Sequence, residues 1–306
     1  RYVVPLEILR MSDCGLIAIH PKAFVGLNNL TSLSISRSVV SSLNAIFNPF
    51  IFGENHMTHL DISVMLLPSL TSEMLGMFHK LVYLDASYSG VNYIQPALFN
   101  QIQNLESLFL QSNHLTVLEN VVALPRLRRL HLNTNELTEI NLRNLTRLEM
   151  VDLSHNQLTA IPTNWMCFSE TILLLNLSHN QIDSIDRHAF SQVSINILDL
   201  SHNQLTSLGP MGSVEVHQLD LSHNALVTVS SESFYFMSNK LGDLDLSYNQ
   251  LTKLPLDIFE DFHSLRRLSL SHNAFGSNLQ SGRLEALFMS LRYLQVLDLS
   301  YNFIRS

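Results

Sequence analysis

The chain has 306 residues, of which 46% are hydrophobic and only 14% charged, and its formal net charge is -8. This composition excludes a disordered chain, and the acidic balance argues against a nucleic-acid partner, because phosphate binding needs a basic surface. No apolar run approaches the roughly 20 residues that a membrane-spanning helix needs.

A repeat with spacings mostly of about 21 to 25 residues runs along the chain. The first frames are degenerate and place Cys14, Ser38, Met65 and Ser89 at a position that asparagine takes later. The clearest frames end in Leu-Ser-His-Asn at residues 153–156, 177–180, 200–203, 221–224 and 270–273. Asparagine occupies this position at Asn113, Asn135, Asn156, Asn180, Asn203, Asn224, Asn249, Asn273 and Asn302. The frames predict about 12 to 13 repeats.

Each frame has the pattern of a short strand followed by a return segment. Alternate residues of a strand point to opposite faces, so Leu130 and Leu132 are expected in the interior. Successive strands would stack in parallel into one sheet on the inner, concave side. A second buried column is expected from the phenylalanines about ten residues after the asparagine position, namely Phe24, Phe99, Phe190, Phe234 and Phe259. The asparagines are expected to hydrogen-bond the main chain of the adjoining turns.

This pattern resembles the typical class of extracellular leucine-rich repeat (LRR) proteins, such as Toll-like receptor ectodomains and insect adhesion and immune proteins. The resemblance implies an α/β solenoid: a horseshoe with a parallel concave sheet and an irregular or short-helical convex side. It covers residues 1–306 as a single LRR domain. Neither end has the cysteine cluster of the family's caps, so we expect a fragment of a longer protein. The resemblance also implies an extracellular location, either secreted or at the cell surface.

Two cysteines and three sequons bear on this location. Cys14 and Cys167 lie about six repeats apart, beyond disulfide reach, and both are expected to be small buried hydrophobic residues. The alternative for Cys167 is a disulfide with a cap outside this sequence. Asn29, Asn144 and Asn176 are the glycosylation candidates. Asn29 and Asn144 fall on return segments, whereas a glycan on Asn176 would block part of the concave sheet.

Two columns of titratable residues recur along the repeats. Histidine recurs just before the asparagine position, and aspartate recurs between the two core leucines, for example at Asp199 and Asp220. Zinc needs three or four converging ligands, which a straight ladder does not supply; the remaining alternative is a pH-sensitive ladder. The aspartates predict a weakly acidic strip, without a pocket, that attracts a basic partner. No catalytic motif is present, so we expect no enzyme, no cofactor and no metal.

The candidate binding surface is where the early frames depart from the Asp-x-Ser-His theme. Exposed aromatic and arginine side chains are favoured at protein interfaces and are not needed for folding. We therefore interpret seven residues as the centre of a ligand-binding concave face: Tyr83, Tyr88, Phe109, Gln111, Arg129, His131 and Asn133. The alternative is that sequence drift made these frames irregular.

The sequence thus predicts a non-enzymatic module that recognises a protein ligand or a partner LRR chain, with a homodimer or heterodimer as a possible assembly. The leading interpretation is an innate-immune receptor or a secreted immune LRR protein. The alternative is a cell-adhesion protein acting by homophilic or heterophilic contact. A role as an enzyme subunit or inhibitor scaffold has only the versatility of the fold behind it.

Overall fold

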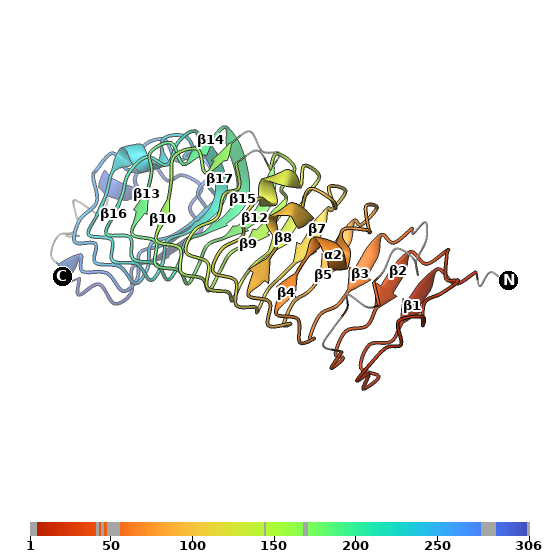
Figure 1. Ribbon diagram of the computed structural model, residues 1–306. Helices are drawn as coiled ribbons and strands as arrows, with labels where there is room; N and C mark the ends of the chain where they lie inside the picture. The colour runs from red at the N-terminus through yellow and green to blue at the C-terminus, as the bar shows by residue number, and fades with distance from the viewer. Residues whose placement is uncertain are drawn as a thin grey trace. The chain divides into compact units, whose positions relative to one another are not determined.

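The computed structural model describes residues 5–40, 43, 46–47, 56–143, 145–167, 171–276 and 286–304. The chain forms two compact units, unit 1 (residues 1–151) and unit 2 (residues 152–306). In each unit every repeat contributes a short strand that pairs in parallel with the strand of the next repeat (Figure 1). Among the described residues, no helix is long and apolar enough to cross a membrane. The interpretation of residues 1–306 as one domain stays a prediction.

The main strands of unit 1 keep one register. They are β1 (Ile8–Arg10), β2 (Ser32–Ser34), β3 (His59–Asp61), β5 (Tyr83–Asp85), β7 (Ser107–Phe109) and β8 (Arg129–His131). Leu60 pairs with Leu84, Leu84 with Leu108, and Leu108 with Leu130. Because the leucines are aligned, the residues on either side of them are aligned as well, on the opposite face of the sheet. Strand β9 (Met150–Asp152) spans the boundary between the units.

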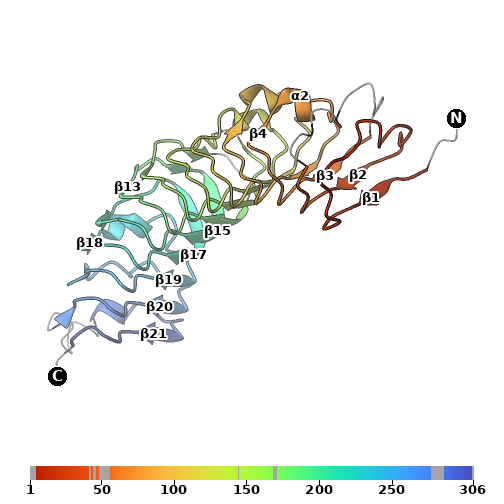
Figure 2. The same ribbon diagram turned by 60° about the horizontal axis from the view of Figure 1, so that its bottom comes forward.

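The main strands of unit 2 follow the same rule. They are β12 (Ile172–Asn176), β15 (Val193–Asp199), β17 (Val214–Asp220), β19 (Asp243–Asp245), β20 (Arg267–Ser269) and β21 (Val296–Asp298). Figure 2 shows β15, β17, β19, β20 and β21 side by side in chain order. Leu219 pairs with Leu244, and Leu244 with Leu268. This alignment places Asp199, Asp220, Asp245 and Asp298 in one row on the face away from the core, with Asn176 and Ser269 at the same position in β12 and β20.

The return segments contain short strand pairs and single helical turns. The pairs are β4 (Ser69–Leu70) with β6 (Tyr93–Ile94), β10 (Ala160–Ile161) with β13 (Ser184–Ile185), β11 (Met166–Cys167) with β14 (Phe190–Ser191), and β16 (Ser207–Leu208) with β18 (Thr228–Val229). The helical turns are α2 (Ser72–Leu75), η1 (Pro96–Leu98), η2 (Val121–Ala123) and η3 (Ser231–Phe234). The predicted class, a parallel-strand solenoid with few and short helices, is confirmed.

The core of each unit is made by aligned leucines and phenylalanines. Leu84, Leu108 and Leu130 are fully buried. The predicted second column is confirmed, because Phe24, Phe99, Phe190, Phe234 and Phe259 all have at most 2% of their surface exposed. The expectation for Cys14 is wrong: its thiol is free and exposed. Cys14 follows β1, whose Leu9 is only half-buried, so the turn after this strand has no deep interior to receive a side chain.

The asparagines of the repeat link adjacent turns through the main chain. The Nδ2 group of Asn113 donates to the main-chain oxygens of Ala86 and Leu110, at 3.0 and 2.8 Å. Its Oδ1 accepts from the main-chain nitrogen of Val91 at 2.9 Å. Nδ2 bonds of the same kind recur at Asn135, Asn180, Asn203, Asn224, Asn249, Asn273 and Asn302. Each such side chain joins the turn of its own repeat to that of the preceding one.

Candidate functional site

Four aromatic rings are in contact on the face of the unit 1 sheet that lies away from the core. His59 stacks on Tyr83 with 5.7 Å between ring centroids, Tyr83 meets Phe109 at 5.2 Å, and Phe109 stacks on His131 at 4.8 Å. We call these four residues the aromatic column. It crosses strands β3, β5, β7 and β8.

Strand register explains why these rings meet. His59 and Tyr83 precede the core leucine of their strands and are paired with each other, whereas Phe109 and His131 follow it and are paired. The residue paired with Phe109 in β5 is Asp85. The Tyr83–Phe109 contact is therefore diagonal, which agrees with its larger interplanar angle of 42°. Tyr83, Phe109 and His131 are half-buried, so the column is a packed platform with an accessible side.

Burial and neighbouring carboxylates both act on the Tyr83 phenol. Burial, followed by the charges of Asp85 and Asp61, raises the pKa of Tyr83 to about 12. The phenol donates to Asp85 Oδ2 at 3.4 Å. Asp85 Oδ1 accepts from the main-chain nitrogen and the hydroxyl of Ser87, at 2.9 and 2.6 Å. The phenol of Tyr83 therefore has the Asp85 carboxylate at its edge, and Ser87 holds that carboxylate in place.

The other four predicted residues are placed around this column. Arg129 is exposed on β8 and its Nη1 lies 3.4 Å from Ser107 Oγ. The Oε1 atom of Gln111 is buried and has no hydrogen-bond partner among the described residues. Asn133 is half-buried two residues beyond His131. Tyr88 lies on the turn after β5 with a positive φ of 55° and 59% of its surface exposed, and no ring contact of the column includes it.

His59 belongs to the column, and the sequence analysis did not include it. It occupies the residue before the core leucine Leu60, which is the position that Tyr83 holds in the next strand. An alignment of the degenerate early frames by their core leucines would have paired the two rings. The sequence contains this alignment, but it lies in early frames that lack the asparagine by which the later repeats are recognised.

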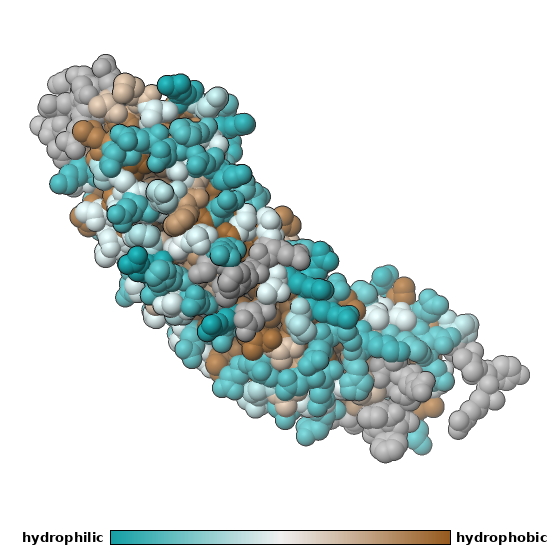
Figure 3. All heavy atoms as spheres, turned by 90° about the horizontal axis from the view of Figure 1, so that it is seen from above, coloured by the Kyte–Doolittle hydropathy of each residue, from teal (hydrophilic) through white to brown (hydrophobic). Residues whose placement is uncertain are grey.

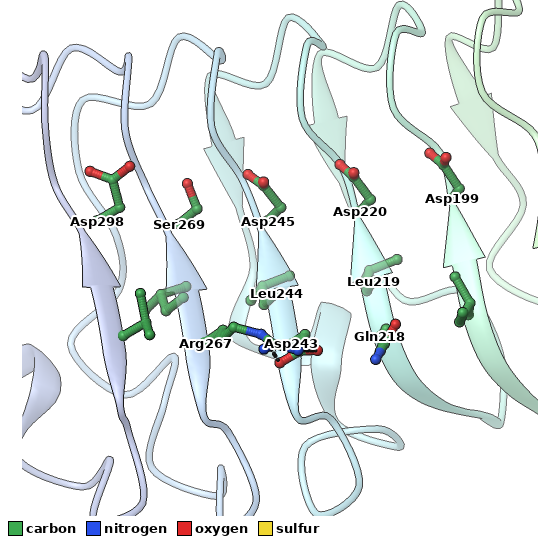
Figure 4. A pocket seen from close by; sticks show the side chains of 13 residues that line it. Asp199, Gln218, Leu219, Asp220, Asp243, Leu244, Asp245, Arg267, Ser269 and Asp298 are labelled. Carbon is green, nitrogen blue, oxygen red and sulfur yellow. Dashed lines mark hydrogen bonds and ion pairs between the residues drawn. The ribbon is translucent and has the colours of Figure 1, made fainter.

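Unit 2 carries a groove on the corresponding face of its own strands, with a volume of about 440 Å³. Figure 4 shows two rows of side chains along it. One row contains Asp199, Asp220, Asp245, Ser269 and Asp298, and the other contains Gln218, Asp243 and Arg267. The expected acidic strip is there, but the expectation that it lacks a pocket is wrong. The residue pattern along one strand does not show how much space lies between the side chains of adjacent strands.

One ion pair lies within the second row of the groove. Arg267 Nε and Nη2 donate to the two carboxylate oxygens of Asp243, at 2.9 and 2.8 Å (Figure 4). This pairing raises the pKa of Arg267. In the first row, hydrogen bonds from Ser300 lower the pKa of Asp298. With one carboxylate neutralised by arginine and a row of four aspartates along the other side, the groove favours cationic side chains of a partner.

The three sequons lie in different settings. Asn29 is exposed on a return segment of unit 1, and Asn144 lies outside the described residues. Asn176 is half-buried in β12, paired with Asp199, and its Oδ1 accepts from Ser178.

In the view of Figure 3, hydrophilic side chains are interspersed with smaller hydrophobic areas. Among the described residues, no group of three or more His, Cys, Asp or Glu side chains is arranged to hold a metal ion.

Comparisons with known proteins agree with this architecture. The leucine rich repeat family model matches residues 103–158, 125–182, 146–205 and 214–275. A second model, the BspA type leucine rich repeat region, matches residues 5–122. Together these matches extend over most of the chain.

Relatives with curated descriptions are similar over nearly the whole chain. An adenylate cyclase of Schizosaccharomyces pombe is 26% identical over 90% of this chain and 18% of its own length. Mouse podocan is 26% identical over 96% of this chain and 56% of its own, and Toll-like receptor 9 of the cat is 27% identical over 97% and 24%. The chain therefore spans less than two thirds of each of these relatives.

Solved structures share the fold. The leucine-rich repeat domain of APL1B superposes with a TM-score of 0.68 and 24% identity, covering 93% of this chain and 86% of that one. A chain of the LRIM1/APL1C complex gives a TM-score of 0.67 and 22% identity over 95% of this chain and 56% of that one. With asparagine-linked turns from Asn113 onward, a parallel strand ladder in each unit and family models matching most of its length, this chain belongs to the leucine-rich repeat family.

Proposed function

We propose that this protein is a non-enzymatic recognition module that binds a protein ligand through the aromatic column of unit 1. The observation that carries the proposal is the contact of four rings, His59, Tyr83, Phe109 and His131, on a sheet face away from the core. Aromatic residues held rigidly on a surface lose little conformational freedom on binding and are enriched at interface hot spots. The fold does not require them there, because the main strands β12 to β21 of unit 2 carry no aromatic residue at either position, and the position of Phe109 and His131 is mostly aspartate in unit 2.

The proposed setting is extracellular, in an innate-immune receptor or a secreted immune LRR protein. Its support is the similarity to Toll-like receptor 9 and podocan, and the shared fold with a chain of the LRIM1/APL1C complex. Adhesion by contact between LRR chains is the second candidate, and homodimers or heterodimers are its expected form. The similarity to an adenylate cyclase covers only 18% of that protein and does not support catalysis by this chain.

The test compares the wild type with the double variant Phe109→Ala/Arg129→Ala against purified extracellular proteins and against the chain itself. A ligand that binds the column should lose more than about thirtyfold in affinity, the size of a hot-spot loss of 2 kcal/mol. Tyr93→Ala is the matched control, because Tyr93 is an exposed aromatic residue of unit 1 on the return strand β6.

The outcomes separate the candidates. A foreign ligand lost in the double variant and kept in Tyr93→Ala supports a receptor. Self-association in analytical ultracentrifugation that disappears in the double variant supports adhesion. Binding that is equal in the wild type and the double variant, with equal melting temperatures, contradicts the placement of the site.

A further inference from the structure

A second and longer column of rings runs through unit 2, outside the surfaces described above. It contains His155, His179, His202, His223, Tyr248, His272 and Tyr301, one from each successive repeat. Neighbouring ring centroids lie 4.0 to 4.2 Å apart and neighbouring planes differ by only 9° to 14°. We call these seven residues the imidazole column. Its rings are face to face, unlike the wider and more tilted contacts of the aromatic column.

The backbone holds each ring in place. Every member of the imidazole column has a positive φ between 52° and 56°, in the turn between the strand and the buried asparagine position. The main-chain nitrogen of His179 donates to Ser201 O of the next repeat at 3.1 Å, and that of His202 donates to Ser222 O at 3.0 Å. Because the turn is fixed on both sides, a ring can leave its neighbours only by rotating its side chain or by loosening the turn.

Parallel stacking argues against a metal site in this column. The ring nitrogens lie in the planes of the rings, so stacked rings direct their lone pairs side by side instead of toward a common point. The charges that face the column are carboxylates of the neighbouring strands: Asp199 acts on His179, Asp220 and Asp245 act on His223, and His272 acts on Asp298. The two members of the column that are not histidines, Tyr248 and Tyr301, carry phenols.

We propose that the imidazole column is a proton-responsive element, closed while its histidines are neutral and opened when neighbouring histidines become charged. Stacked rings about 4.1 Å apart bring like charges into direct contact once two neighbours are protonated, and such contacts are destabilising. The carboxylates named above offset part of this repulsion, since each interacts with a histidine of the column. The column contains five histidines, whereas the carboxylates named above number four, so the offset is incomplete.

The titration behaviour of two members agrees with this geometry. Burial, followed by the charges of His155 and His202, lowers the pKa of His179 below its ordinary value of 6.5, although Asp199 acts in the opposite direction. Burial, followed by the charge of His202, lowers the pKa of His223, against Asp220 and Asp245. A histidine with a lowered pKa in the folded state resists protonation there. Stability is therefore lost as the pH falls through about 6.5, and the loss ends below the lowered value.

Opening the column would change a neighbouring surface. The rings of His202, His223, Tyr248, His272 and Tyr301 line an open groove of about 940 Å³ together with Phe303 and the amide side chains of the adjoining turns. In mild acid this groove gains positive charge and its walls separate, so the same surface presents a different shape and a different charge.

The chain itself supplies the matched replacement. The ring centroid of Tyr248 lies 4.1 Å from that of His223 and 4.0 Å from that of His272. A phenol therefore fits the column without disturbing the stack. The triple variant His179→Tyr/His202→Tyr/His223→Tyr should therefore keep the stacked rings and lose three titrating groups. His188→Tyr/His263→Tyr is the control, because both histidines are exposed in unit 2 and lie outside the column.

The first measurement is the melting temperature of the full chain from about pH 7.5 to about pH 5, the range in which histidine titrates. The wild type and the control variant should lose stability with acid, and the triple variant should lose at most about half as much. An acid response that is the same in the wild type and the triple variant would overturn the proposal, and so would a wild type without any acid response.

A second measurement covers the case in which the triple variant does not fold. NMR titration of the imidazole Cε1 protons should give His179 and His223 midpoints below 6.5 with broadened curves, as expected for interacting sites. The single change His202→Tyr removes the charge between them and should raise both midpoints. Midpoints that do not move in His202→Tyr would show that the rings titrate independently, and the proposal would fail.

Discussion

The side-chain nitrogen of Asn135 donates to the main-chain oxygen of Leu110, 2.9 Å away in the preceding repeat. The same nitrogen donates to Leu132 O at 3.0 Å, and Oδ1 accepts from the nitrogen of Leu115 at 3.0 Å. With 8% of its surface exposed, Asn135 fills main-chain hydrogen-bonding positions that water does not reach. These contacts join consecutive turns of unit 1 through the main chain.

Asn135→Ala should therefore be destabilising without touching the aromatic column. It removes one donor from the main-chain oxygens of Leu110 and Leu132 and the acceptor of the Leu115 nitrogen, and we expect a loss of about 2 to 4 kcal/mol in the free energy of unfolding. Urea denaturation measures this loss. Asn133→Ala is the control, because Asn133 lies two residues away on the sheet face; an equal loss in both variants would contradict the role of Asn135.

Gly212 offers a second stability test in unit 2. Its φ is +99°, and a Cβ atom added there would lie 1.9 Å from the main-chain oxygen of Phe190. Gly212→Ala combines an unfavourable backbone conformation with a clash against main chain that cannot rotate away, so we expect a loss of about 3 kcal/mol or more. Gly209→Ala is the matched control, since a Cβ at Gly209 meets nothing within 4 Å. Thermal unfolding of the two variants should differ clearly, and similar melting temperatures would refute the close approach.

The strand positions and the core could be predicted from the sequence because they depend on local alternation. In each frame the spacing of the leucines alone determines which side chains face the interior, as at Leu130 and Leu132, both of which are fully buried. The phenylalanine column follows for the same reason, since its members recur at a constant distance after the turn.

Contacts between repeats were harder to predict. Whether Tyr83 meets Phe109 depends on a diagonal offset between neighbouring strands and on the rotamers of both rings, and neither is encoded in one frame. His59 was missed because its frame lacks the asparagine signal. Cys14 was expected to be buried because it occupies the position that asparagine takes in later repeats. The strand before it, β1, is itself partly exposed, and Cys14 is exposed with it. The position of a residue within a repeat predicts which way its side chain points. Whether that side chain is buried depends on the residues that the adjacent repeat packs against it.

Tyr83 should dominate the alkaline behaviour of unit 1. Burial and the charges of Asp85 and Asp61 raise its pKa to about 12, above the roughly 10 of an unfolded tyrosine. The folded state therefore favours the protonated phenol, and the stability that this group contributes below pH 10 is lost as the pH rises toward 12. Tyr83→Phe keeps the ring in the column and removes the ionisation.

The measurement is unfolding by urea between about pH 9 and about pH 11, the range over which an unfolded tyrosine ionises. Tyr83→Phe should lose less stability than the wild type across this range. Asp85→Asn should lower the pKa of Tyr83 without returning it to 10, because burial is the largest cause of the shift. A phenol that titrates near 10 in the wild type, followed by its absorbance, would contradict the half-buried position of the ring.

Glycosylation tests the extracellular setting and the position of the binding face together. Asn29 is exposed on a return segment, whereas Asn176 is paired with Asp199 in β12 and its Oδ1 accepts from Ser178 at 3.0 Å. In protein secreted from eukaryotic cells, we expect mass spectrometry to find a glycan on Asn29 and none on Asn176, where it would extend over the row of carboxylates. Asn29→Gln should remove the glycan and leave ligand affinity unchanged. Thr31→Ala also destroys the sequon, but it is a poorer variant because Thr31 Oγ1 donates to Glu7 O at 3.1 Å. An unmodified Asn29 in secreted protein would contradict the prediction, and a glycan on Asn176 that leaves binding intact would place the ligand away from that part of unit 2.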